Sequence, residues 1–155
     1  MQRMTALSPN REFFVLYSVA QNCYYWHMTT DVFEKGAAAY RAGNKGEAAR
    51  RWQVGAEHGD VECQWPFGMM RLMGVGIEQD LTEGDRWLGR AAETKAIGGD
   101  PERCYELASI HATGILDGTK AAENDVRFSV DEKKARYWFN VAERYGSLRA
   151  TIWRR

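Results

Sequence analysis

Three tryptophans in this chain stand in the same local frame, and this repetition constrains the fold more than any other feature. The frames are Trp52-x-x-x-Ala56, Trp87-x-x-x-Ala91 and Trp138-x-x-x-Ala142. Upstream of the second and third frames, the segments 60–68 and 100–108 share a pattern of acidic, aromatic, large apolar and small residues. A repeat unit cannot bury its apolar face alone, so it must stack on its neighbours. The pattern predicts an all-α fold: a short right-handed α-solenoid of about three helical hairpins.

The 155 residues are interpreted as a single domain, 1–155, because a chain of this length with 45% apolar residues can form one core. Ser8-Pro9 is typical of a helix start. Phe13, Tyr17 and Tyr24 follow at helical spacing, which predicts an N-terminal capping helix over 8–28. The other predicted units are a degenerate repeat at 31–59, a repeat at 60–99, a repeat at 100–146 with a loop insertion at 115–130, and a terminal helix stub at 147–155.

Charge and composition exclude several classes of partner. Lysine plus arginine equals aspartate plus glutamate at 21 each, so no global field attracts nucleic acid or an anionic membrane. The apolar run 13–17 is too short to cross a bilayer and lacks a signal-peptide cleavage site. We therefore expect a cytoplasmic protein without membrane insertion, or a periplasmic one if a signal peptide was removed. Cys23, Cys63 and Cys104 are isolated and odd in number, which favours reduced thiols.

The segment 68–92 carries a specific motif, Gly68-x-x-Arg-x-x-Gly74-x-Gly76-Ile-x-x-Asp80-x-x-x-Gly84-x-x-Trp87-x-x-x-Ala91-Ala92. It closely resembles the Sel-one-like repeat, a subfamily of the tetratricopeptide-like solenoids, and the resemblance covers roughly residues 32 to 146. In such a hairpin Gly68 allows close helix approach, Gly74 and Gly76 allow positive φ, and Asp80 and Asp131 cap the second helices. Two departures are Pro66, which is expected to interrupt a first helix, and the replacement of an expected tyrosine by Arg71 and His111.

No motif in the chain supports catalysis, a metal or a cofactor. The run from Gly74 to Gly76 begins like a dinucleotide fingerprint, but a glutamine stands at the third glycine position and no β-rich strand precedes it. The three histidines lack partners at metal-ligand spacing, and no serine or cysteine has a recognisable base motif. We therefore expect a protein that is not an enzyme and that holds no metal and no cofactor.

The candidate partner-binding residues fall into two groups. The first lies at the ends of the first helices, where a methionine cluster is either ordinary core or a flexible binding surface. The second is the insertion, whose polar loop either contacts a partner or is tolerated drift. The candidates are Met69, Arg71, Met73, His111, Asp117, Lys120, Glu123, Asp125, Arg127 and Phe128. Trp65 and Tyr105, which share an aromatic position of the repeat, are expected in the core.

The resemblance implies a non-enzymatic module that binds one protein partner through a concave face lined by the first helices. Relatives of this type act as bacterial adaptors, or as immunity proteins that neutralise secreted toxins, and we expect a monomer or a weak homo-oligomer. One alternative is a small enzyme or ligand-binding domain that uses Arg71, His111 and the long loop. The other is a structural oligomerisation spacer, which a large apolar patch on the terminal helix would favour.

Overall fold

The computed structural model describes residues 31–114 and 129–153, and every described element of regular structure is helical. A helix over 31–41 is followed by α2 (Lys45–Glu57), α3 (Val61–Met73), α4 (Leu81–Ile97), α5 (Glu102–Thr113), α6 (Glu132–Arg144) and α7 (Leu148–Trp153). The prediction of an all-α protein is confirmed. The predicted cap at 8–28 and residues 115–128 of the insertion lie outside the described residues.

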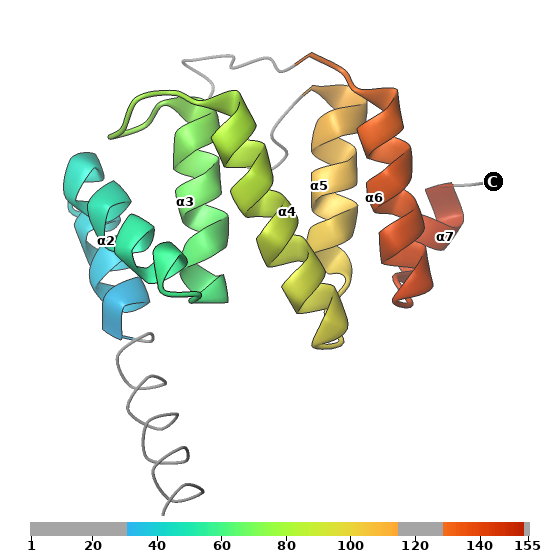
Figure 1. Ribbon diagram of the computed structural model, residues 1–155, viewed down its shortest axis with the longest axis horizontal. Helices are drawn as coiled ribbons and strands as arrows, with labels where there is room; N and C mark the ends of the chain where they lie inside the picture. The colour runs from blue at the N-terminus through green and yellow to red at the C-terminus, as the bar shows by residue number, and fades with distance from the viewer. Residues whose placement is uncertain (1–30, 115–128, 154–155) are drawn as a thin grey trace, which may run out of the picture.

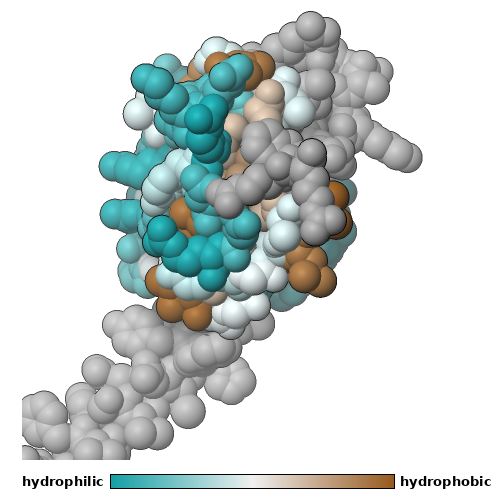
Figure 2. Space-filling view, turned by 90° about the vertical axis from the view of Figure 1, so that its right-hand side faces the viewer, coloured by the Kyte–Doolittle hydropathy of each residue, from teal (hydrophilic) through white to brown (hydrophobic). Residues whose placement is uncertain are grey.

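Each helix packs mainly on the helices next to it along the chain. The closest packing is within the pairs α3–α4 and α5–α6, which stand side by side as antiparallel hairpins (Figure 1). Among the described helices, none is both long and apolar enough to cross a membrane. The C-terminal helix α7 is short and rests on α6, at the end of the row shown in Figure 2. Hydrophobic residues appear at that end as separate patches beside a broad hydrophilic area.

Local signals that the sequence carries set where the helices begin and end. Asp80 and Asp131 cap α4 and α6, each accepting a hydrogen bond from the backbone N–H three residues later, as predicted. Gly74 ends α3 in the left-handed conformation at φ 68°, and Gly76 follows at φ 70°. A Cβ at Gly76 would lie 2.4 Å from the Lys45 carbonyl group, so this turn also packs closely on the start of α2.

Pro66 does not interrupt the helix, and that prediction is wrong. It lies inside α3, which continues on both sides of it from Val61 to Met73. A proline in a helix removes one backbone donor, whose partner here would have been the Glu62 carbonyl in the first turn. Because burial of Cys63, Phe67 and Met70 holds α3 against its neighbours, tertiary packing outweighs the local cost.

The core is formed around the three repeated tryptophans. Trp52, Trp87 and Trp138 are only 6%, 6% and 8% exposed, which confirms that the repeated position is a buried anchor. Trp87 meets Phe67 edge to face at 5.7 Å, which links α4 to α3. Cys63 and Cys104 are free and buried, while Cys23 lies outside the described residues.

Candidate partner-binding surface

An apolar stripe on α3 remains partly exposed. Trp65, Met69 and Met73 recur every four residues, so they share one face of the helix. All three are partly buried and pack against the core cluster that α4, α5 and α6 form. Met70, by contrast, is 1% exposed and belongs to the other cluster. The methionine cluster therefore divides: Met70 is core, and the two candidate residues Met69 and Met73 lie on the outer face.

Helix α5 continues this surface. Tyr105 and Ala112 are partly buried against the same cluster, and the Ser109 hydroxyl between them donates a hydrogen bond to the Tyr105 carbonyl at 3.0 Å. Trp65, Met69, Met73, Tyr105 and Ala112 are called the α3–α5 face below. Trp65 and Tyr105, which were expected in the core, lie at its edge: both are partly buried and pack against the cluster.

Two arginines cover the aromatic rings of the α3–α5 face. The Arg103 guanidinium lies 4.7 Å from the centre of the Trp65 ring, and that of Arg149 lies 4.3 Å from the centre of the Tyr105 ring. Each arginine belongs to the next first helix along the row, α5 or α7. Such stacking contributes about 0.5 to 1 kcal/mol at an exposed site. These contacts therefore tie successive hairpins together along the exposed face.

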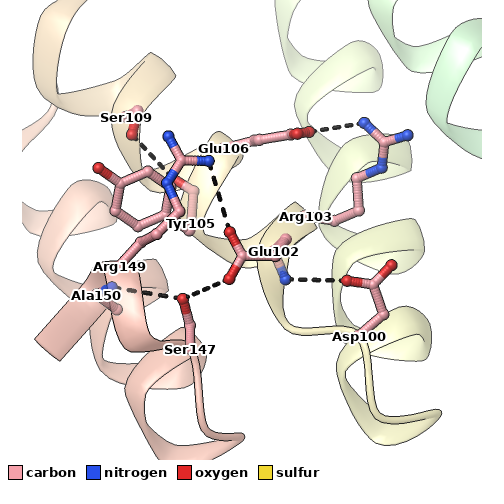
Figure 3. Close-up of polar contacts among 9 residues, drawn as sticks. All are labelled: Asp100, Glu102, Arg103, Tyr105, Glu106, Ser109, Ser147, Arg149 and Ala150. Carbon is pink, nitrogen blue, oxygen red and sulfur yellow. Dashed lines mark hydrogen bonds and ion pairs between the residues drawn. The ribbon is translucent and has the colours of Figure 1, made fainter.

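Carboxylates hold both arginines in place. Arg103 Nη1 lies 2.7 Å from Glu106 Oε2. Glu102 accepts a 2.9 Å hydrogen bond from the Ser147 hydroxyl and lies 3.5 Å from Arg149 Nη1, so it joins α5 to α7 (Figure 3). Arg103 and Glu102 are not among the residues predicted from the sequence. A usable signal exists for the arginines: Arg103 and Arg149 each directly precede a buried small residue, Cys104 or Ala150.

Arg71 is used to fix the turn between α3 and α4. Its Nη1 donates to the Glu78 carbonyl at 2.9 Å, and its Nη2 lies 2.5 Å from Glu83 Oε2. Glu83 also accepts a 3.4 Å hydrogen bond from the Trp87 indole. The structure therefore gives this candidate binding residue an internal partner on α4.

His111 lies in a separate cluster centred on Asp85. His111 Nε2 is 2.8 Å from Asp85 Oδ1, and Lys134 Nζ is 2.6 Å from Asp85 Oδ2, so one carboxylate of α4 meets α5 and α6. Burial acts to raise the pKa of Asp85, but the His111 ring and the Lys134 ammonium outweigh it, and the pKa falls below its ordinary value. A cavity of about 100 Å³ adjoins the cluster, with Leu72, Leu107 and Ile110 among its walls.

The same corner holds the two ends of the long insertion. The Asp131 amide donates to the His111 carbonyl at 2.9 Å, which brings the start of α6 against the last turn of α5. The pKa of Asp131 is lowered mainly by the hydrogen bond that its carboxylate accepts from the Lys134 backbone N–H. The remaining candidates, Asp117, Lys120, Glu123, Asp125, Arg127 and Phe128, lie outside the described residues.

Comparison with known proteins gives one partial similarity and no family. No protein-family model matches the chain. The chain is 27% identical over 122 residues to a protein from Rhizobium leguminosarum bv. viciae described as an exopolysaccharide production negative regulator. The match covers 75% of this chain but only 43% of the relative, so the chain spans less than half of that protein's length.

Proposed function

We propose that this chain is a non-enzymatic protein-interaction module, built as a right-handed solenoid of Sel-one-like repeats, and that the α3–α5 face binds one protein partner. The observation that carries the proposal is the row Trp65, Met69 and Met73, which stays partly exposed beside Tyr105. A protein interface needs aromatic and flexible apolar anchors surrounded by a polar rim. Glu106 and Glu102, with their arginine partners, supply that rim.

The chemistry of Cys63 and Cys104 argues against nucleophilic catalysis by either thiol. Burial, with Glu93 and Asp100 nearby, raises the pKa of Cys104 to about 11. Burial and the Asp60 carboxylate raise the pKa of Cys63 further still. The thiolate is the reactive form, so both groups are largely unreactive at neutral pH.

The description of the similar protein as an exopolysaccharide production negative regulator favours the adaptor form of this proposal. In that form the module holds a bacterial regulatory partner rather than neutralising a secreted toxin as an immunity protein. The partner docks on the first helices, and Met69 and Met73 repack around it because methionine side chains are flexible and polarizable.

The proposal is tested by affinity capture from the native cell with matched variants. Met69→Lys places a charge on the α3–α5 face, whereas Val54→Lys places the same charge at a 50% exposed position on α2. Both variants should fold, which circular dichroism and melting check. A partner retained by wild type and Val54→Lys but lost with Met69→Lys supports the proposal. Equal retention by all three proteins rejects the α3–α5 face as the binding site.

A ligand-binding role at the Asp85 cluster is the second candidate, favoured by the cavity beside a carboxylate of lowered pKa. The pair of variants His111→Ala and Met69→Lys separates the two functions. If His111→Ala abolishes partner capture and Met69→Lys does not, the partner docks at the Asp85 cluster and the α3–α5 face is rejected. A different observation favours the structural oligomerisation spacer: Leu148 and Ile152 on α7 are 79% and 72% exposed and could pack on another copy of the chain.

A further inference from the structure

A second cavity lies between three successive helix pairs, at one end of the α3–α5 face. Its volume is about 260 Å³, and it is bounded by the helix over 31–41 and by α2, α3, α4 and α5. The apolar part of its wall consists of Phe33, Trp52, Val61, Trp65, Pro66 and Ala91. Trp65 belongs both to this wall and to the α3–α5 face, so the cavity is continuous with the proposed interface.

The cavity is large enough for one bulky side chain. An apolar cavity of about 150 Å³ can hold a benzene molecule. The walls are held firmly, because Trp52 donates its indole N–H to the Phe33 carbonyl at 3.2 Å and the two rings stack at 6.3 Å. A pocket with fixed walls avoids much of the ordering cost that weakens binding.

The charges at the mouth of the cavity are neutralised within the protein. Three charged residues line it: Lys95, Arg103 and Glu62. Lys95 Nζ pairs with Glu62 Oε1, and Arg103 pairs with Glu106 while its guanidinium lies over the Trp65 ring. Because each of these charges already has a partner in the protein, a charged guest would lose its hydration at an apolar wall without gaining a free partner, which is costly. The cavity therefore favours an uncharged occupant.

We propose that this cavity is the anchor pocket of the binding surface and that it takes one large uncharged side chain, aromatic or aliphatic, from the protein partner. Pro66 contributes apolar surface to the wall of this cavity. This inference rests on the proposed binding function, because the occupant belongs to the partner. Beyond that function, the pocket specifies the kind of side chain that the surface recognises.

The pocket can be tested without the partner, by NMR titration of the full chain with three small probes. N-acetyl-phenylalaninamide is neutral, N-acetyl-phenylalanine carries a carboxylate and phenylalaninamide carries an ammonium group. The neutral probe should shift the indole N–H signals of Trp52 and Trp65, saturate in the millimolar range, and show intermolecular NOEs to these rings. The two charged probes should bind several-fold more weakly. Equal binding of all three probes, tighter binding of a charged one, or no NOE to either ring overturns the proposal.

A matched pair of variants shows where on the protein the neutral probe binds. Val61→Phe adds bulk to the cavity wall and should abolish the shifts, whereas Val54→Phe adds the same bulk outside the cavity and should leave them unchanged. If Val61→Phe fails to fold, the wild-type NOEs still decide the matter. Probe binding that survives in a folded Val61→Phe protein places the site elsewhere. Failure of the probe experiment, with partner capture still lost in Met69→Lys, rejects the pocket and leaves the α3–α5 face intact.

Discussion

At the scale of single residues, the repeated tryptophan is the anchor of each hairpin. Trp138 is 8% exposed and meets the Tyr137 ring at 5.0 Å. It also reaches the neighbouring hairpin: a Cβ added at Gly89 on α4 would lie 3.1 Å from the Trp138 ring. Gly89 therefore leaves room for the indole of the next second helix. Trp138 therefore both fills the core and joins α4 to α6.

Replacing Trp138 with alanine should destabilise the protein by about 3 to 5 kcal/mol, because a large buried side chain leaves a cavity that the neighbours fill only in part. Tyr137→Ala is the matched control, since Tyr137 is 53% exposed and adjacent in sequence. It should cost less than about 1 kcal/mol. Urea unfolding followed by circular dichroism measures both. Similar losses for the two variants would contradict the anchor assignment.

At the scale of elements, the two helices of the second hairpin cross through a pair of glycines. A Cβ at Gly84 would lie 2.8 Å from the Gly68 carbonyl oxygen, and one at Gly68 would lie 3.0 Å from the Gly84 carbonyl oxygen. Neither backbone can move without separating α3 from α4. The close approach requires glycine at both positions even though glycine weakens a helix.

This crossing predicts opposite effects for two glycine substitutions. Gly84→Ala should destabilise the protein despite the higher helix propensity of alanine, because its Cβ meets backbone. Gly46→Ala is the control in α2: its nearest contact would be 3.6 Å away, so alanine should stabilise by roughly 0.5 to 1 kcal/mol. Melting temperatures of the two variants check the signs. A Gly84→Ala protein as stable as wild type would show that the helices can separate at little cost.

The Asp85 cluster joins three helices and makes stability depend on pH. The folded-state pKa of Asp85 lies below its ordinary value of about 3.9. Its contribution is therefore fully present above the ordinary value and is lost as the pH falls through the lowered one. Asp85→Asn should be less stable than wild type at pH 7, and the difference should shrink in that acidic window. Unfolding free energies of both proteins at pH 7 and in acid measure this difference. A stability difference that grows in acid would contradict the lowered pKa of Asp85.

An interaction between helices or turns could be predicted from the sequence only where its two residues are close along the chain. Caps such as Asp80 and Asp131 act on an amide three residues away, so their spacing is visible in the chain. The contact between Lys134 and Asp85 spans 49 residues and depends on how hairpins stack. The stacking of Arg103 on Trp65 is of the same kind. For this reason the helices and anchors were predictable, whereas these two contacts between distant residues were not.

At the scale of the whole molecule, buried tryptophans on the second helices leave the first helices to carry the α3–α5 face. Arginines cover the aromatic rings of that face, and an apolar cavity opens at one end of it. If this face binds a protein partner, as we propose, affinity should depend on the first helices and be insensitive to the exposed side of the second helices.

The most direct test is the dissociation constant of the captured partner, measured by calorimetry for wild type and two tyrosine variants. Tyr105 lies on the α3–α5 face, and Tyr137 is exposed on α6, so Tyr105→Ala and Tyr137→Ala remove the same group from two surfaces. Binding should be at least tenfold weaker for Tyr105→Ala, about 1.4 kcal/mol, and should change by less than about twofold for Tyr137→Ala. Full affinity in a folded Tyr105→Ala protein, or a loss confined to Tyr137→Ala, would contradict this prediction.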